Sequence, residues 1–227
     1  MKILYKIVHS LLLLAIIPIL LFLPLVRFIM VLSLSSSSGL GLLGGLIGNA
    51  IDVNKIVSNA IGYDLSTLPE YWSILDIRSF FFGENAKIKT EGFDLTAIPE
   101  TVTGPVRAAI ILLIVAVAFA VIALITGLIV NKRKWIAAIP SLLGVGCAVG
   151  ANALFSKGAE LLVSGRVSVQ SILQNVPALE QYKTYLEFLK VDIRIFDLSS
   201  AYTMLLLVLA AAAVFSVIMT IVEYVSD

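Results

Sequence analysis

Cysteine, histidine and charged side chains are scarce in this sequence. One cysteine and one histidine occur among 227 residues, which excludes an intramolecular disulfide and a zinc site built from several cysteines. Only 14% of the residues are charged, and the formal net charge is +1. A chain this close to neutral has neither the basic surface of a nucleic-acid-binding protein nor an acidic disordered tail. Nucleic acid is therefore excluded as a partner.

Apolar sequence, in contrast, is abundant. Hydrophobic residues make up 59% of the chain, and the mean hydropathy of +1.03 is well above that of a water-soluble domain. A bilayer span needs about 20 mostly apolar residues, and four stretches meet this requirement. They predict an all-α membrane protein, a four-transmembrane-helix bundle with two extracytoplasmic, mainly helical segments. The predicted order is a first span in residues 1–34, an outer segment 35–105, a span 106–130, a turn 131–134, a span 135–155, an outer segment 156–201, a span 202–222 and a tail 223–227.

The basic residues predict the orientation. Lys132-Arg133-Lys134 lies in the short turn between the second and third spans, and Lys2 and Lys6 precede the first. Since Lys and Arg in short loops stay on the cytoplasmic side, the turn and both termini are predicted to be cytoplasmic. The chain is then a multi-pass protein of the plasma membrane, with both long connections outside.

The first apolar stretch allows three interpretations. Residues 1–34 resemble a cleaved signal peptide in having a basic start, but the apolar run is longer than the usual 7–15 residues. Residues 28–51 as a fifth span would move Lys132-Arg133-Lys134 outside, against the charge rule. The favoured interpretation is one long or broken helix, with Pro18 and Pro24 inside it.

A pentapeptide recurs and predicts an internal repeat. Asp76-Ile77-Arg78-Ser79-Phe80 returns as Asp192-Ile193-Arg194-Ile195-Phe196, each time after a helical segment that starts with proline. A true duplication would give two parallel copies of a unit made of a span, an outer segment and a span. Chance similarity is the alternative, because the alignment needs gaps.

Aromatic and arginine side chains in the outer segments are the candidate partner contacts. Such residues bury large areas and form directional bonds, so they dominate binding energy at interfaces. The alternative role of the phenylalanine cluster is anchoring within the protein's own core. The candidates are Tyr71, Trp72, Arg78, Phe80, Phe81, Phe82, Tyr182 and Arg194.

Small residues one helical turn apart predict close helix packing. Gly39-x-Gly41-x-x-Gly44 matches a dinucleotide-binding string, but it lies within apolar sequence and does not join a strand to a helix. Close approach of two helix backbones is the better explanation. The predicted packing glycines are Gly41, Gly44, Gly45, Gly48, Gly146 and Gly150, and a similar strip consists of Ala116, Ala120, Ala123 and Gly127.

Little in the sequence indicates catalysis or transport. His9 is expected at the cytoplasmic interface, and Cys147 lies in mid-span among small residues, which disfavours a reactive thiol. Transport normally places ionisable side chains deep in the membrane. Arg27 is the one candidate, and it is expected to extend to the outer surface.

Four spans with a longer first and a shorter second outer segment resemble the plan of claudins and tetraspanins. The resemblance is topological and covers the whole chain. Both families carry outer-segment cysteines that form disulfides, whereas Cys147 lies in a predicted span, and Trp72 stands without the claudin cysteine pattern. No family is therefore assigned.

The expected function is that of a non-enzymatic membrane protein without a cofactor. It would be a structural, adhesive or accessory subunit whose outer segments and small-residue helix faces meet other membrane subunits or a second copy. The alternative is a small oligomeric channel or transporter, and a membrane-embedded enzyme ranks third.

Overall fold

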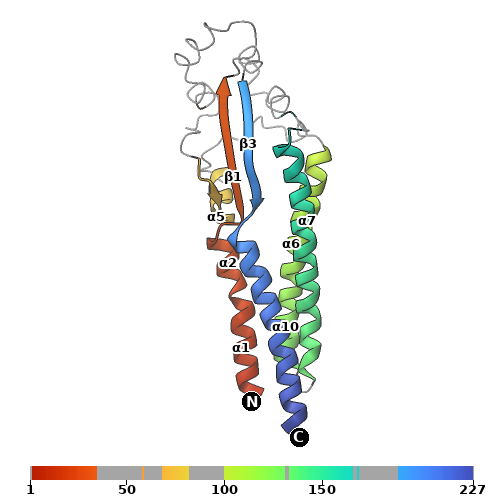
Figure 1. The fold of residues 1–227 in the computed structure, drawn as a ribbon. Coiled ribbons are helices and arrows are strands. Elements are labelled where there is room, and N and C mark those ends of the chain that lie inside the picture. Colours follow the sequence, from red (N-terminus) through yellow and green to blue (C-terminus); the bar gives the residue numbers. More distant parts are fainter. Residues whose placement is uncertain are drawn as a thin grey trace. The chain divides into compact units, whose positions relative to one another are not determined.

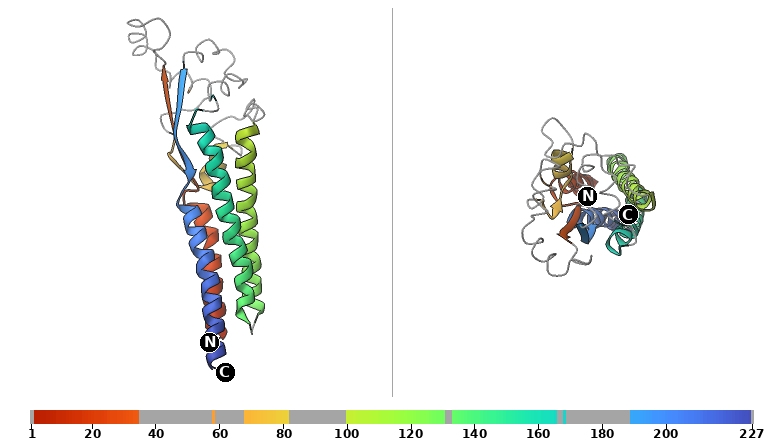
Figure 2. Two further views of the ribbon diagram at one scale, coloured as in Figure 1. Left: turned by 45° about the vertical axis from the view of Figure 1, so that its right-hand side comes forward. Right: turned by 90° about the horizontal axis from the view of Figure 1, so that it is seen from above.

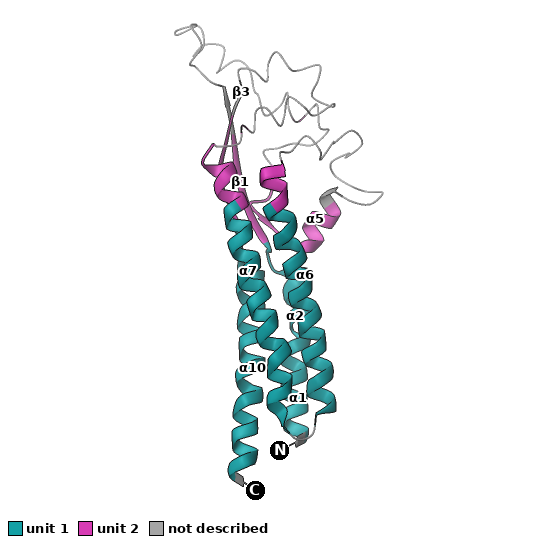
Figure 3. Cartoon of the chain, turned by 90° about the vertical axis from the view of Figure 1, so that its right-hand side faces the viewer, with its two compact units in different colours: residues 1–25, 105–157, 198–227 teal, residues 26–104, 158–197 magenta. Residues whose placement is uncertain are grey.

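The structure is a computed structural model that describes residues 2–34, 58, 68–81, 100–130, 133–165, 168 and 189–226. These residues are mostly helical and divide into two compact units (Figure 3). The helical unit comprises residues 1–25, 105–157 and 198–227, and the strand unit comprises residues 26–104 and 158–197. Because the two are separate bodies, each is described by itself.

Four helical segments are long and apolar enough to cross a membrane, as predicted. Their bounds are Ile3–Phe22, Glu100–Ile129, Lys134–Val163 and Ser200–Val225. They are built from α1 (Lys2–Leu14), α2 (Ile16–Phe22), α6 (Glu100–Ile129), the 3₁₀ helix η3 (Lys134–Ala137), α7 (Ala138–Val163) and α10 (Ser200–Ser226) (Figure 1). The chain is therefore built as a multi-pass membrane protein.

The break between α1 and α2 is caused by a missing donor. Proline has no backbone N–H, so Pro18 cannot bond to the carbonyl four residues earlier in the helix. Helical bonding continues on either side, with the Ala15 N–H donating to Leu11 O at 3.1 Å and the Ile19 N–H donating to Ala15 O at 3.2 Å. The two helices form one span that is locally broken, which is one of the forms expected for the first helix.

The first span ends earlier than predicted. α2 stops at Phe22, Leu23 is extended at φ −83° and ψ 148°, and Val26–Leu34 form strand β1. A residue before proline avoids helical backbone angles, so Pro24 ends the helix at Leu23. The expectation that the span continues to residue 34 is therefore wrong. The β-branched and aromatic residues of Val26–Leu34 suit a strand as well as a helix, and a short apolar run alone does not distinguish a strand from a helix.

Alanine and leucine fill the core of the helical unit. The predicted strip on α6 is confirmed, since Ala116, Ala120 and Ala123 are all buried. Short side chains let the helices approach closely, and longer ones fill the remaining space. The main core cluster consists of Leu13, Ile16, Ala120, Ala123, Leu205, Leu209 and Ala212.

Both chain termini lie at one end of the helical unit, together with the end of α6 and the start of η3 (Figures 1 and 2). α10 packs along α1 and α2 and against η3. At its other end, the Ser199 N–H donates to Leu25 O at 2.8 Å and the Ala201 N–H donates to Pro24 O at 2.9 Å. The first and last spans are thus held together at both ends. The side of the membrane that the termini face stays a prediction from Lys132-Arg133-Lys134.

The strand unit contains a three-stranded sheet in the order β2-β1-β3, with β2 at Tyr71–Trp72 and β3 at Leu189–Leu198. β1 and β2 are antiparallel, with Val26 opposite Trp72. Figure 1 shows β1 and β3 running in opposite directions. The expectation of an all-α protein with mainly helical outer segments is therefore wrong for these residues, because backbone pairing between distant segments replaced helical bonding.

The structure does not support the pentapeptide as a structural repeat. Asp76 to Phe80 lie in helix α5 (Ile74–Phe81), whereas Asp192 to Phe196 lie in strand β3. Helices and strands project side chains with different periods, so the shared letters do not mark equivalent positions.

Candidate functional site

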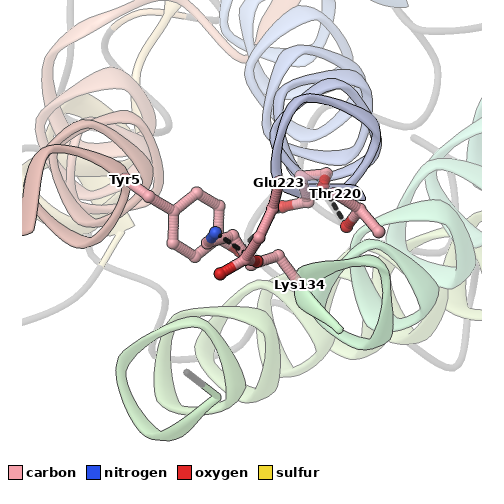
Figure 4. Close-up of polar contacts among 5 residues, drawn as sticks. Tyr5, Lys134, Thr220 and Glu223 are labelled. Atoms are coloured by element: carbon pink, nitrogen blue, oxygen red, sulfur yellow. Dashed lines mark hydrogen bonds and ion pairs between the residues drawn. The ribbon is translucent and has the colours of Figure 1, made fainter. Parts of the chain in front are cut away.

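A cluster of polar side chains is buried at the termini end of the helical unit. Lys134, at the start of η3, is only 2% exposed, and its Nζ lies 2.7 Å from Glu223 Oε2 near the end of α10. Glu223 is 23% exposed. A cation removed from solvent to this extent requires a close anion. The ion pair therefore joins the chain entering α7 to the last turns of α10 (Figure 4).

Tyr5 of α1 completes this cluster. The Tyr5 and Ser216 hydroxyl oxygens lie 3.0 Å apart, and Ser216 Oγ lies 2.9 Å from Ala212 O. Since the single Ser216 proton is donated to Ala212 O, Tyr5 is the donor to Ser216. Lys134 Nζ also lies 5.6 Å from the Tyr5 ring centroid, within range of a cation–π interaction. Three segments distant in sequence meet at Tyr5.

His9 packs beside Tyr5 and is 1% exposed. The two rings are stacked with centroids 5.3 Å apart. A Cβ at Gly127 of α6 would overlap the His9 imidazole, so only glycine fits at this position. His9 Nε2 has no hydrogen-bond partner among the described residues. His9 is therefore a packed side chain rather than the interfacial residue expected from the sequence.

This cluster of Tyr5, His9, Lys134, Ser216 and Glu223, here called the inner cluster, is built to hold helices together. His9 stacks on Tyr5, and the other four side chains bond to one another or to their own helix. Among the described residues, no group of three His, Cys, Asp or Glu side chains could hold a metal ion. The arrangement restrains α1, η3 and α10 against sliding.

The strand unit has a second charged cluster, Arg27, Glu70 and Tyr71. The Arg27 guanidinium forms a hydrogen-bonded ion pair with the Glu70 carboxylate and lies 5.3 Å from the Tyr71 ring centroid. The hydrogen bond that Arg27 donates to the Glu70 carboxylate raises the pKa of Arg27 above its ordinary value. Arg27 is thus fully charged and links β1 to β2, outside the spans, instead of extending from a transmembrane helix as expected.

The predicted contact residues have different environments. Tyr71 is 45% exposed, whereas Trp72 is 6% exposed and buried. Arg78 on α5 and Arg194 on β3 are exposed. The backbones of Phe80 and Phe81 belong to α5, and their side chains lie outside the described part. Two further candidates, Phe82 and Tyr182, also lie outside the described residues.

The predicted packing glycines also differ. A Cβ at Gly150 would lie 3.2 Å from Leu112 Cδ1, so this glycine belongs to the contact between α7 and α6. Gly146 has no atom within 4 Å of that position and faces open space. Gly144, one turn from Ala148, would approach Ala116 O at 3.3 Å. Outside the described residues are Gly41, Gly44, Gly45 and Gly48.

Sequence reasoning did not find the inner cluster. From the sequence, Lys134 indicates only the orientation, and Glu223 is the first residue of the predicted tail 223–227. One signal for the cluster is in the sequence: Glu223, an acidic residue next to the last predicted span, could pair with the basic turn Lys132-Arg133-Lys134. Choosing that partner required knowing that α10 packs against η3.

Comparisons of the chain with protein-family models, with curated proteins and with solved structures found no match. The class of protein is therefore defined by the four apolar helices, which are those of a multi-pass membrane protein.

Proposed function

We propose that this protein is a non-enzymatic integral membrane subunit with a structural, adhesive or accessory role. Its termini face the cytoplasm of the plasma membrane, and its strand unit lies outside, where it meets another membrane protein or a second copy. The observation that carries the proposal is the continuation of the first span into β1 and of β3 into the last span. This continuity supports a folded extramembrane part that is joined to the helices through the chain.

The interior of the helical unit supports a static role. Its main core cluster consists of alanine, leucine and isoleucine side chains. Two hydroxyl side chains of α10 bond within their own helix, with Ser216 donating to Ala212 O and Thr220 donating to Ser216 O, both at 2.9 Å. Solute passage through one chain would need polar groups turned toward a path. Groups already satisfied by their own helix do not offer one.

The partner test uses Arg194. This side chain is 64% exposed, and its Nε is 3.9 Å from an Asp192 carboxylate that is itself 53% exposed. An exposed arginine on a strand can form bidentate bonds with a partner carboxylate. Full-length protein carrying Arg194→Glu is expected to lose chains that co-purify from mild detergent, whereas Lys157→Glu on α7 keeps them. Co-purification that survives Arg194→Glu, or no co-purifying chain at all, contradicts the proposal.

Orientation is tested by labelling in a Cys147→Ala background. Cysteine introduced at Asn131 is expected to be shielded from an impermeant thiol reagent in intact cells, and cysteine at Arg194 is expected to react. The reverse pattern would place the termini outside.

A small oligomeric channel is the second candidate, and one observation favours it. Asn152 is exposed on the membrane-spanning helix α7. Polar side chains on the outside of a span are costly in lipid, and helix association satisfies them. Several copies could therefore meet at Asn152 around a polar path. Ion currents in liposomes that disappear in Asn152→Leu would establish this alternative.

A further inference from the structure

The inference concerns the end of the helical unit that carries both termini, where the inner cluster lies. An exposed aromatic side chain follows each member of the buried Lys134–Glu223 pair. Trp135 is 45% exposed, and Tyr224 is 86% exposed. Exposed tryptophan and tyrosine at the ends of membrane spans mark the level of the lipid headgroups. The ion pair therefore lies at the border between hydrocarbon and headgroups.

Two further cations belong to this level. Lys6 follows Tyr5 in α1, and the Tyr5 ring centroid is 5.6 Å from Lys134 Nζ (Figure 4). Arg133 directly precedes Lys134 and is the residue from which η3 begins. Lys6 is half-buried, and Arg133 is exposed. The contact between Tyr5 and Lys134 thus brings two cations from distant segments to the same end of the helices.

These two cations lack an anion. Among the described residues, no side chain forms an ion pair with Lys6 or Arg133. Glu223 is already paired with Lys134. The sequence of residues 1–6, 131–134 and 223–227 contains five basic and two acidic side chains, a surplus of three positive charges. The counter-ions of Lys6 and Arg133 must therefore come from outside the described part of the chain.

The backbone at Arg133 is unusual for arginine. Its φ of 55° and ψ of 53° are left-handed, a conformation that glycine and asparagine adopt more readily. The Ile136 N–H donates to Arg133 O at 3.0 Å, which fixes the turn into η3. That bond uses only the backbone of Arg133. The turn does not need the guanidinium, which is thus left available for a ligand.

Apolar side chains surround the Lys6 position. Ile3 and Ile7, within one helical turn of it, are 76% and 52% exposed. Exposed apolar residues on a membrane span face lipid, so the Lys6 stem lies beside acyl chains and its ammonium extends to the headgroups. A soluble anion would make no use of these apolar neighbours, whereas a phospholipid contacts them with its acyl chains.

We propose that Lys6 and Arg133 bind the headgroup of an anionic phospholipid, with Trp135 and Tyr224 beside its glycerol backbone. A guanidinium forms bidentate hydrogen bonds with phosphate oxygens, and an ammonium adds a point charge. The shape of the site follows from the inner cluster. Because Glu223 neutralises Lys134 from within, the two flanking cations are left for the lipid.

This inference goes beyond the proposed function and rests on it only through the choice of leaflet. Termini that face the cytoplasm place the site in the leaflet that is richest in anionic lipid. Vesicles with the same lipids in both leaflets remove this dependence. An inverted topology therefore leaves the lipid test valid, and a failed lipid test leaves the partner role of Arg194 standing.

The test measures which lipids lie beside Trp135 in full-length protein. Trp72→Phe leaves Trp135 as the one tryptophan, and phospholipids with brominated acyl chains quench its emission. Vesicles contain phosphatidylcholine and phosphatidylglycerol in fixed proportion, with bromine on one lipid or on the other. The ratio of the two quenching efficiencies gives the relative affinity for anionic lipid. Every variant must elute at the same size as the parent protein.

Phosphatidylglycerol is expected to be preferred in the Trp72→Phe protein by about fivefold or more, since each cation near an anionic surface strengthens attraction about fivefold. Lys6→Gln and Arg133→Gln should each lower this preference several-fold, and the combined variant should remove it. Lys157→Gln is the matched control, because Lys157 is exposed near the other end of α7. It should leave the preference unchanged.

Substitutions at Arg133 separate its charge from its backbone. Arg133→Lys keeps the charge and should keep most of the preference. Arg133→Gly suits the left-handed backbone, so the protein should keep its fold and lose much of the preference. A preference that survives Arg133→Gly would overturn the proposal.

Three further results would also overturn it. One is equal quenching by the two lipids in the Trp72→Phe protein, which would leave the cations for an acidic partner protein. Another is a loss in Lys157→Gln as large as that in Lys6→Gln, which would show a response to net charge alone. The third is a preference abolished by inorganic phosphate but not by sodium chloride of the same ionic strength, since a soluble phosphate would then be the occupant.

Discussion

Two ion pairs among the described residues, each made of a cation and a glutamate, lie in different surroundings. Lys134–Glu223 belongs to the helical unit, with side chains 2% and 23% exposed, and Arg27–Glu70 belongs to the strand unit, with side chains 33% and 40% exposed. Each pair joins segments distant in sequence. Burial, rather than the presence of a contact, determines how much stability is lost when one partner of each pair is removed.

The physical reason is desolvation. Removing one partner of a buried pair leaves a charge that water cannot reach, whereas a half-exposed charge regains water and is screened by salt. The helical unit should therefore respond strongly to charge removal, and the strand unit weakly.

The largest expected effect comes from Glu223→Gln, because it leaves the Lys134 ammonium buried without an anion. A loss of about 3 kcal/mol in the free energy of unfolding is expected. Thermal unfolding in a fixed detergent measures it, with Glu70→Gln as the matched control. The double variant Lys134→Met with Glu223→Leu should recover most of the loss, since no charge stays buried. An equal response at Glu223 and Glu70 would remove the distinction between the two pairs.

The next effect is steric and is confined to the helical unit. Gly127→Ala places a Cβ 2.3 Å from His9 Nδ1, so the ring must move within a packed core. Such overpacking costs about 1–3 kcal/mol. Gly146→Ala is the control, because open space surrounds that position and alanine favours the helix by about 1 kcal/mol over glycine. Equal stability of the two variants would show that His9 does not pack against α6.

A smaller loss is expected for Gly150→Leu. The first atom of the new side chain meets only the flexible end of Leu112, at 3.2 Å, and the rest must displace it. A cost of about 1 kcal/mol or more is expected from overpacking, whereas Gly146→Leu should be tolerated. If only Gly146→Leu changes oligomeric size in detergent, the open face of α7 meets another chain.

Tyr5→Phe removes one hydrogen bond and keeps the ring beside His9 and Lys134. Within membranes, hydrogen bonds between helices contribute about 0.6 kcal/mol on average. A small decrease in unfolding temperature is expected, and His9→Phe would test the stacking separately. A loss as large as that of Glu223→Gln would show that the hydroxyl, rather than the ion pair, holds the inner cluster together.

The smallest effect belongs to the strand unit. Glu70→Gln should cost at most about 1 kcal/mol, and the cost should shrink as salt is raised, since exposed charges are screened. Local hydrogen exchange of β1 and β2 measures the change better than global unfolding does. A salt-independent loss would indicate that Arg27 is desolvated by lipid or a partner.

Prediction from the sequence succeeded where the bilayer imposes simple rules. The four spans and the buried alanines Ala116, Ala120 and Ala123 follow from apolar length and small-residue spacing. Prediction was wrong at Val26–Leu34, because the same apolar residues suit a membrane helix or a strand. The internal repeat predicted from the recurring Asp-Ile-Arg sequence is not supported for a related reason. One copy lies in helix α5 and the other in strand β3, and the two elements project side chains with different periods.

By itself, the sequence determined the class of protein, since more than half of its residues are apolar and four of its described helical segments are long and apolar enough to span a bilayer. That information is local, because each span satisfies its own backbone hydrogen bonds. Tertiary structure alone decided that residues 26–34 form a strand whose start pairs with Tyr71 and Trp72, and that Lys134 pairs with Glu223 rather than with solvent. Strand pairs and buried ion pairs each need a partner from a distant segment, and only the folded chain brings that partner within hydrogen-bond distance.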